Sequence, residues 1–380
     1  MSEPRANKEC ILLAPCLDSD DWLSIKEYNA RVLEHLGRHA DRYDIRVCSP
    51  PGKALRSRYA KAVVRNLIYP LHVRRLLRNA AAPTVLHVTD QFHAPLLRAD
   101  RPCVATCHDL IVLKHSALSR GQRARWIRRV RCLRRAHLVF ADSRHTALDL
   151  QTALGVAPER IVVNYLGVDK AFRRLPQDHR FTAVAERLRQ LAETHKLVLH
   201  VGSNVVQKNM PTLLRGVGEI RRSGVRVLLV KVGEPLRTGA YEPLVRELAL
   251  GSSILDLGRI ARSELVEVYN CCHAFLFPSL YEGFGLPVLE AQASGLPCVI
   301  SDASSLPEVG GEAALYHAPD DFAGMASNAL RVLNEPQAGD ELRNKGMANA
   351  GRFTWEAHVE CLVRGYRTVG LRTEADAARR

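Results

Sequence analysis

The sequence predicts an α/β protein with two doubly wound parallel-sheet domains that face each other across a cleft. Its 380 residues are more than one hydrophobic core usually serves. Short apolar runs rich in β-forming residues alternate with longer segments of helical periodicity, which is the pattern of βαβ units. The alternation occurs in two series, separated by a polar and charged passage at residues 173–189.

The two series predict two domains, an N-terminal one at residues 1–175 and a C-terminal one at residues 190–350. We expect the first sheet to contain strands at 11–14, 45–48, 85–88, 104–107, 138–141 and 161–164. We expect the second sheet to contain strands at 197–201, 227–232, 254–257, 274–277 and 298–301. Ligands of such folds bind beyond the carboxyl ends of the strands, so the residues that follow each strand are the candidates for a site.

The segment from 279 to 290 carries the clearest chemical signal. The apolar run 274–277 before it reads as a buried strand. Pro287 suits the first position of a helix, and Gly295 reads as a helix stop. A short helix is therefore expected over residues 288–294.

Two carboxylates, Glu282 and Glu290, lie around this turn. A helix start offers free N–H groups and a positive dipole end to a phosphate, and Gly283 and Gly285 let a ligand approach the backbone closely. A carboxylate beside that phosphate can accept hydrogen bonds from sugar or ribose hydroxyls. In the alternative interpretation, Glu290 only complements the helix dipole and Glu282 is a solvated loop acid.

Two other strand ends add candidates, His108 in the first half and Lys208 in the second. Lys208 precedes a helix expected from Pro211, where it can meet a phosphate. His108 can act as a general base or donate a hydrogen bond to a sugar. A purely structural histidine is the alternative.

Positive charge is concentrated in the first half of the chain. Residues 1–175 hold 31 Lys+Arg against 16 Asp+Glu, whereas residues 176–380 hold 23 against 24. Two stretches, at residues 56–78 and 120–135, mix basic with apolar residues in the manner of amphipathic helices, which suit an anionic membrane surface. We favour that surface narrowly over a merely solvated face. Nucleic acid is not expected as a partner, because no nucleic-acid-binding motif accompanies the charge.

The amino-terminal residues lack the pattern of a signal peptide, and no run of about 18 apolar residues occurs. We expect a cytoplasmic protein, at most peripheral on the inner face of a membrane.

The cysteines form no C-x-x-C pair and lie mostly in apolar runs, so they read as buried thiols. Cys103, Cys107 and His108 have no second cluster with zinc spacing, so no metal site is expected.

Taken in order, the motifs resemble the retaining glycosyltransferases of the glycogen-synthase-like family 4 type, whose GT-B fold consists of two Rossmann-like domains. The segments that carry the resemblance are His108-Asp109, Ala141-Asp-Ser143, Asn164-Tyr-Leu-Gly-Val-Asp169, Val201-Gly202 with Lys208-Asn209, Leu257-Gly258 and, above all, Phe277-Pro-Ser-Leu-Tyr-Glu-Gly-Phe-Gly-Leu-Pro-Val-Leu-Glu290, continuing through Ala293-Ser-Gly-Leu-Pro297 to Leu306-Pro-Glu-Val-Gly310. Arg352-Phe-Thr-Trp-Glu356 looks like the start of the family's final helix. A helix over 355–380 is therefore expected to return to the N-terminal domain.

The resemblance implies that the C-terminal domain binds a nucleotide-diphosphate sugar. Glu290 would hold the ribose hydroxyls, and Lys208 would neutralise the diphosphate leaving group. The backbone of Phe284, Gly285 and Leu286 would face the sugar and phosphates. Glu282 would contact the donor sugar near the reacting centre, and His108 would hydrogen-bond a sugar hydroxyl across the cleft.

The sequence departs from the family's pattern in two places. The loop after the first strand, residues 15–22, has no glycine and is acidic, and Asp18-Ser-Asp20 within it reads as polar lining rather than a metal motif. The family's basic residue after the first strand of the second domain is absent, since Ser203 or Asn204 occupies its position. Arg259 is then the candidate for a second basic partner of the phosphates. We expect no metal and no cofactor, with charge stabilised by Lys208 and the helix terminus.

The sequence therefore predicts a retaining hexosyltransferase, with a mannose-type sugar weakly favoured. It would move the hexose from a nucleotide sugar to a glycan or lipid-linked acceptor in cell-surface polysaccharide assembly. The alternatives are a nucleotide-sugar epimerase of the same fold and a basic module that binds nucleic acid or membrane. The donor's base and sugar, the acceptor, the linkage and the oligomeric state stay open.

Overall fold

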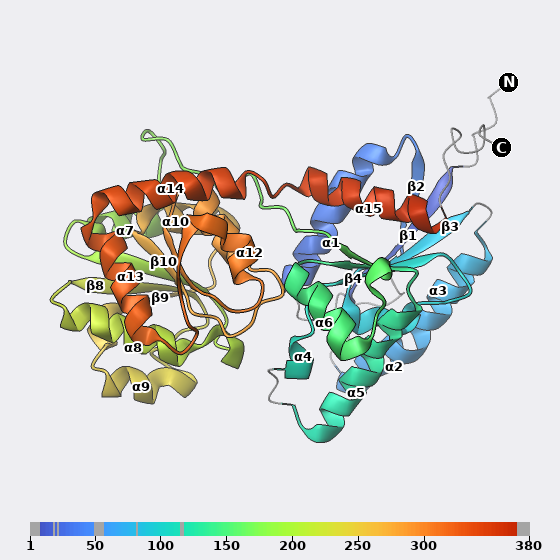
Figure 1. Cartoon of the computed structure of the whole chain (residues 1–380), viewed down its shortest axis with the longest axis horizontal. Coiled ribbons are helices and arrows are strands. Elements are labelled where there is room, and N and C mark those ends of the chain that lie inside the picture. Colours follow the sequence, from blue (N-terminus) through green and yellow to red (C-terminus); the bar gives the residue numbers. More distant parts are fainter. Residues whose placement is uncertain are drawn as a thin grey trace. The chain divides into compact units, whose positions relative to one another are not determined.

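The computed structural model describes residues 8–17, 20, 23–48, 57–80, 83–114 and 118–370. The chain forms two compact units (Figure 1). Unit 1 consists of Met1–Gly167 with Trp355–Arg380, and unit 2 of Val168–Thr354. Each unit has one six-stranded sheet, and every registered strand pair is parallel. The predicted α/β fold with two parallel sheets is confirmed.

The sheet of unit 1 has the strand order β2-β1-β3-β4-β5-β6. Its strands are β1 (Glu9–Ala14), β2 (Tyr43–Val47), β3 (Thr84–Val88), β4 (Cys103–Cys107), β5 (Leu138–Ala141) and β6 (Ile161–Val163). Its α-helices are α1 (Leu23–Leu36), α2 (Arg58–Val63), α3 (Tyr69–Arg78), α4 (Ile111–Lys114), α5 (Arg120–Val130), α6 (Arg144–Leu154) and α15 (Trp355–Val369). The strands are runs of buried apolar residues because both faces of a parallel sheet are covered.

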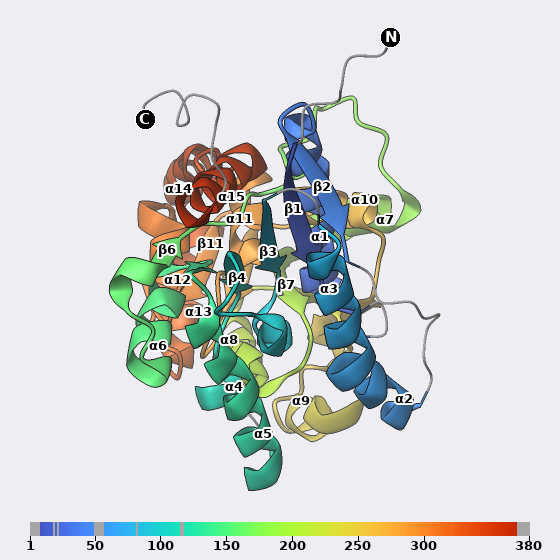
Figure 2. The same ribbon diagram turned by 90° about the vertical axis from the view of Figure 1, so that its right-hand side faces the viewer.

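The last described helix, α15, completes the core of unit 1. Tyr366 is buried, and its hydroxyl lies 2.7 Å from Nδ1 of His87 on β3. Close approach to β5 depends on Gly365, because a Cβ there would come within 2.3 Å of the Phe140 ring. Figure 2 shows α15 with the helices and strands of unit 1. The returning helix of the sequence prediction is present as Trp355–Val369, while residues 371–380 lie outside the described part of the chain.

The sheet of unit 2 has the strand order β12-β11-β10-β7-β8-β9. Its strands are β7 (Lys196–Gly202), β8 (Val227–Gly233), β9 (Ile254–Gly258), β10 (Ala274–Phe277), β11 (Cys298–Ser301) and β12 (Ala314–His317). Its helices are α7 (Ala183–Ala192), α8 (Met210–Arg222), α9 (Glu242–Glu247), α10 (Arg262–Cys271), α11 (Leu286–Ala293), α12 (Leu306–Gly310), α13 (Phe322–Asn334) and α14 (Pro336–Ala350). β12 was not predicted, because this four-residue edge strand contains a tyrosine and a histidine that interrupt the apolar run.

The basic segment at 120–135 is only partly α-helical. After α5 the chain tightens into a 3-10 helix, Arg131–Arg135. The basic segment before it contains a π-helical turn, Val64–Ile68, between α2 and α3.

All ten cysteines are free thiols, and seven of them are buried, as expected for small core side chains. No helix within the described ranges is long and apolar enough to cross a membrane.

Candidate donor-binding site

The turn before α11 in unit 2 is fixed by a glycine. Gly285 has a positive φ of 110° and stands at the N-cap of α11, which begins at Leu286, two residues before the predicted start. A Cβ on Gly285 would lie 2.9 Å from Cδ2 of Leu306. Both the dihedral angle and the space therefore require glycine at the start of this helix.

Lys208 and Glu282 meet at the carboxyl ends of two adjacent strands, β7 and β10. Nζ of Lys208 donates to Oε1 of Glu282 at 2.8 Å and lies 4.6 Å from the centroid of the Phe277 ring. The lysine is thus held by an ion pair and a cation–π contact. Of the predicted site residues, these two are brought into direct contact.

Two serines after β11 hold the backbone around Glu282. The amide of Glu282 donates to Oγ of Ser304 at 2.8 Å. Oγ of Ser305, which is buried, lies 3.0 and 2.7 Å from the carbonyl oxygens of Glu282 and Phe284, which share its one hydrogen. Ser304 and Ser305 were not predicted as site residues, although their position directly after a predicted strand was an available signal.

Lys231 supplies a second cation that the sequence analysis also missed. It lies on β8, is fully buried, and donates from Nζ to the carbonyls of Gly202 at 2.6 Å and Val232 at 3.1 Å. Burial lowers the pKa of Lys231 to about 8. The backbone is tight here, since a Cβ on Gly233 would come within 2.1 Å of the Gly202 carbonyl oxygen. The signal in the sequence was a lone lysine in the apolar run of β8.

His200 lies on β7 and stacks on Phe277, with ring centroids 5.7 Å apart. Its Nδ1 lies 3.0 Å from the carbonyl of Leu276, and because a carbonyl only accepts, Nδ1 carries the proton. Burial and the nearby charge of Lys231 lower the pKa of His200 well below its usual value, so the ring is neutral. Its Nε2 is buried and has no hydrogen-bond partner among the described residues.

Glu290 is in the second turn of α11. Its Oε2 accepts a hydrogen bond from the hydroxyl of Tyr269 on α10 at 3.0 Å. Burial raises the pKa of Glu290 to about 7, although the positive charge of Arg262 acts in the opposite direction. A carboxylate in this setting is poised to accept from a ligand hydroxyl in its ionised form and to hold a proton in mildly acidic solution.

Three further residues were predicted at the donor site: Ser203, Asn204 and Arg259. Ser203 is partly exposed in the loop after β7. The amide of Asn204 donates to Oε2 of Glu234 at 2.7 Å, and its Nδ2 donates to the carbonyl of Pro235, so Asn204 braces the loop after β8. Arg259 is exposed beyond β9, two strands from β7, and no described contact joins it to Lys208.

Both the ring and the backbone carbonyl of Phe284 have partners in unit 2. Its ring is buried and stands edge-on to Phe353, with centroids 5.9 Å apart, while its carbonyl accepts from Ser305. Leu286 opens α11. The roles of the backbone at 284–286 toward sugar and phosphate stay predictions.

In unit 1, His108 lies directly after β4 and is held at both ring nitrogens. Nδ1 lies 2.7 Å from Oδ2 of Asp142, and Nε2 lies 3.0 Å from the carbonyl of Thr89. Burial lowers the pKa of His108, but the carboxylates of Asp142, Asp90 and Asp109 together raise it to about 9. His108 is therefore an imidazolium that donates from both nitrogens within unit 1. His108 thus joins the ends of three strands, β3, β4 and β5, and its roles as a general base or as a contact of the donor sugar stay predictions.

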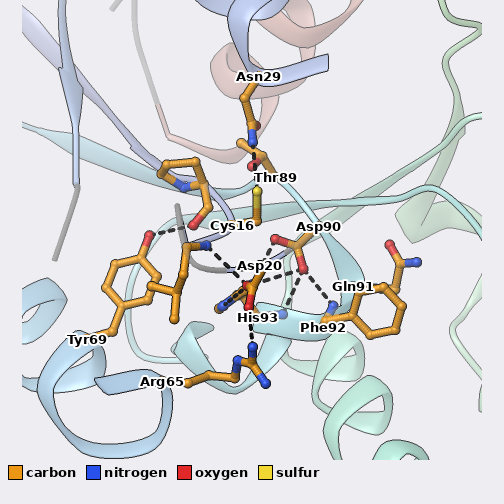
Figure 3. A network of polar contacts seen from close by, with 12 residues as sticks. Cys16, Asp20, Asn29, Arg65, Tyr69, Thr89, Asp90, Gln91, Phe92 and His93 are labelled. Carbon is orange, nitrogen blue, oxygen red and sulfur yellow. Dashed lines mark hydrogen bonds and ion pairs between the residues drawn. The ribbon is translucent and has the colours of Figure 1, made fainter. Parts of the chain in front are cut away.

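A second polar network of unit 1 surrounds Asp20 (Figure 3). Asp20 is buried, pairs with Arg65 and accepts from the amide of Leu17. Asp90 accepts from the amide and the ring of His93, and its pKa is lowered chiefly by His93 despite burial. Asp20 is thus a structural acid that closes the loop after β1, while Asp18 and Ser19 lie outside the described residues.

Among the described residues, no group of three or more His, Cys, Asp and Glu side chains is placed to hold a metal ion. Cys103 and Cys107, the thiols considered for zinc, are both buried in β4.

Comparison with known proteins relates both units to sugar transfer. Residues 27–172 match the family described as Glycosyltransferase Family 4, and residues 195–335 match the family described as Glycosyl transferases group 1. The crystal structure of Anabaena Alr3699/HepE in complex with UDP superposes with a TM-score of 0.72 at 17% identity, covering 95% of this chain and all of that one. At that identity the similarity concerns the fold.

Two curated relatives are mannosyltransferases. The serotype-specific mannosyltransferase WbdA of Escherichia coli is 27% identical over 72% of this chain, and the chain spans only about a third (34%) of its length. The MMP α-(1→4)-mannosyltransferase of Mycolicibacterium hassiacum is 30% identical over 72% of this chain and 67% of its own. With two six-stranded parallel sheets, matches in both units and these relatives, the chain belongs to the family 4 glycosyltransferases of the GT-B fold.

Proposed function

We propose that the chain is a retaining hexosyltransferase that moves a mannose-type sugar from a nucleotide-diphosphate donor to a glycan or lipid-linked acceptor. The observation that carries the proposal is Lys208, held against Glu282 and the Phe277 ring in front of the turn that opens α11. A cation beside a helix start suits a diphosphate. The preference for mannose rests on the two mannosyltransferase relatives.

When the donor binds, its phosphates replace Glu282 as the partner of the Lys208 ammonium group. Lys231 holds the Gly202 carbonyl by a hydrogen bond and adds positive charge near the proposed phosphate site. The amino terminus of α11 contributes its dipole. The ribose hydroxyls donate to Glu290, whose carboxylate is oriented by Tyr269. Glu282, released from the ion pair, faces the transferred sugar.

The reaction breaks the bond between the sugar's anomeric carbon and the β-phosphate oxygen, and the bond to the acceptor oxygen forms on the same face. The acceptor's hydroxyl proton passes to the departing phosphate, which leaves as a nucleoside diphosphate. Lys208 stabilises the negative charge that develops on this leaving group. No metal and no resident cofactor take part in this proposal.

We propose that the chain acts in the cytoplasm, in cell-surface polysaccharide assembly, on acceptors presented at the inner face of a membrane. The excess of basic residues in residues 1–175 supports this setting, because anionic lipid attracts clustered arginines and lysines. UDP in the similar HepE structure supports a nucleoside diphosphate as the ligand class.

A thermal-shift screen with nucleoside diphosphates tests the donor site first. We expect at least one of ADP, GDP, UDP, CDP and dTDP to raise the melting temperature, because a ligand of the folded state stabilises it by mass action. The matching α-hexose donor, hydrolysed slowly by the enzyme, should release the sugar initially as the α-anomer. The absence of any stabilising nucleotide, or release of the β-anomer, would contradict the proposal.

The epimerase alternative gains no support from the matched families, both of which are transferases. Incubating the enzyme with donor alone distinguishes the two activities. Transfer requires an acceptor or water and releases a nucleoside diphosphate, whereas epimerisation converts the intact donor sugar into its epimer.

A further inference from the structure

The helical segment from Arg58 to Arg78 in unit 1 exposes a row of large apolar side chains. Tyr59, Val63, Leu67 and Leu71 are spaced four residues apart and are 87%, 50%, 57% and 52% exposed. They make up half of the exposed large hydrophobic side chains of the described residues, although the segment is short. We call these four residues the apolar row.

The same segment already has an apolar face that serves the fold. Val64, Tyr69, Val73 and Leu77 are buried in the core of unit 1. The apolar row is therefore a second apolar face of one helix. A helix that only covered a core would carry polar residues on its outward face.

A π-helical turn keeps the row in line. In an α-helix, each four-residue step runs about 40° beyond a full turn, so a four-membered row winds around the axis. The turn from Val64 to Ile68 is π-helical, with more residues per turn, and it rotates the following residues back. Leu67 and Leu71 are thereby kept near the line set by Tyr59 and Val63. Such turns often occur at functional sites.

Arginines continue the row at its carboxyl end. Arg75 and Arg78, four and seven residues after Leu71 on α3, share its helical face and are exposed. No Asp or Glu occurs between Asp44 and Asp90 in the sequence. The outward face of this segment is thus apolar first and then basic, with no acid near in sequence.

The basic helix α5 adjoins this segment. Arg129 of α5 donates from Nη1 to Oδ1 of Asn66 in the π turn at 2.7 Å, and from Nε to the carbonyl of Phe92 at 3.0 Å. Burial lowers the pKa of Arg129, and Arg65 contributes to that shift. Arg129 thus joins α5 to the π turn, and α5 also carries the exposed arginines Arg120, Arg123, Arg125 and Arg128.

We infer that the apolar row lies in the interface of an anionic lipid bilayer, with the arginines of α3 and α5 on the lipid headgroups. A helix with apolar side chains beside arginines binds such an interface through buried apolar area and charge attraction together. Duplex nucleic acid would use the arginines but leaves no role for the apolar row. A second copy of the chain would bring like-charged arginines together. The inference concerns unit 1 alone and does not rest on the donor site.

Vesicle flotation with the full chain tests the inference. The native chain should bind vesicles of phosphatidylglycerol and phosphatidylcholine, and bind pure phosphatidylcholine far less. Leu67→Ser/Leu71→Ser should weaken binding to the anionic vesicles by roughly tenfold or more, because insertion is lost while the charge stays. Leu148→Ser is the matched control, since Leu148 is 53% exposed on α6 and outside the row; it should bind like the native chain.

Two further measurements keep the result specific. Arg75→Gln/Arg78→Gln should weaken vesicle binding and reduce its dependence on salt, because fewer lipid charges are paired. A Leu67→Trp variant should gain tryptophan emission that brominated lipid quenches. Circular dichroism and the thermal midpoint should be unchanged in all variants, because the substituted side chains are exposed.

Four outcomes would overturn the inference. The first is that the native chain does not bind anionic vesicles, and the second is that the double serine variant binds them unchanged. The third is retention on duplex DNA that is stronger than vesicle binding and is lost in the serine variant. The fourth is a dimer in sedimentation velocity that the serine substitutions dissociate while vesicle binding is absent.

Discussion

Nζ of Lys208 lies 2.8 Å from Oε1 of Glu282, so the cation expected to meet the donor's diphosphate is already paired with a carboxylate. The two side chains are only 15% and 14% exposed, which shields the pair from solvent. A diphosphate must therefore compete with Glu282 for one ammonium group. The pair orients Lys208 in the free protein and makes the charge of Glu282 available once a donor has bound.

This competition predicts opposite effects of Glu282→Gln on binding and on reaction. The variant should bind the free nucleoside diphosphate roughly two- to fivefold more tightly, equivalent to about 0.5–1 kcal/mol, because Lys208 loses its internal partner. Transfer of the sugar should slow strongly, since the carboxylate at the sugar is gone. Calorimetric titration and single-turnover rates measure the two effects. Weaker binding of the nucleoside diphosphate would show that Glu282 does not compete for Lys208.

Glu290→Ala should weaken nucleotide-sugar binding by about 1–3 kcal/mol, because a largely buried carboxylate that accepts from ligand hydroxyls is removed. The loss should be far smaller for the 2′,3′-dideoxynucleotide, which lacks those hydroxyls. Glu341→Ala, an exposed glutamate on α14, is the control and should bind like the native chain. Unchanged donor affinity in Glu290→Ala would count against the assigned site.

The pKa of Glu290, about 7, predicts a pH dependence with opposite signs for affinity and stability. Donor affinity should fall as the pH drops from 8 to 6, because the protonated carboxyl accepts fewer hydrogen bonds. The folded state binds the Glu290 proton more tightly than the unfolded chain, so this group's contribution to stability is greatest at low pH and is lost as the pH rises through 7. Glu290→Gln should flatten both curves, measured by titration calorimetry and by denaturant unfolding.

Lys231→Met should lower the affinity for nucleoside diphosphates by roughly tenfold while leaving the affinity for the bare nucleoside unchanged. The ammonium of Lys231 holds the Gly202 carbonyl at the end of β7 and adds charge under the phosphate position. Lys196→Met at the opposite end of β7 is the matched control. An equal loss for nucleoside and nucleoside diphosphate would assign Lys231 to general stability.

His108 should make unit 1 less stable in alkaline solution. Its pKa is raised from 6.5 to about 9, so the folded state holds a proton that the unfolded chain has lost. The resulting stabilisation is fully present below pH 6.5 and is lost as the pH rises through 9. Compared with His108→Gln, the native chain should lose roughly 2–3 kcal/mol between pH 7 and 10. Denaturant unfolding of both proteins across that range measures the difference; parallel curves would contradict it.

Much of the fold was predictable because strands buried on both faces are nearly continuous apolar runs. The turn at Gly285 was also predictable from local sequence, because glycine and proline are typical of such a turn. The contact between Lys208 and Glu282 follows from two strand ends that turn out to be neighbours in the sheet. Short-range signals therefore located the parts of the site that lie on strand ends.

Partners that depend on strand register could not be predicted. Lys231 reads as an anomaly in an apolar run until β8 is paired with β7, which brings its ammonium to the Gly202 carbonyl. The two bonds of His108 likewise require β3 and β5 beside β4. The π turn at Val64–Ile68 could not be read from the sequence, because it differs from the α-helix around it only by having more residues per turn.

The contribution of α15 to unit 1 has a consequence for synthesis on the ribosome. The sheet of unit 1 is complete at Val163, yet the surface around His87 and Phe140 stays open until Tyr366 has been made. At ribosomal speeds that interval lasts roughly ten to forty seconds. Unit 2 is contiguous in sequence and can fold during this time. The half of the protein that is translated first is thus the last to be finished, and a nascent chain halted before α15 would present chaperones with an unclosed core.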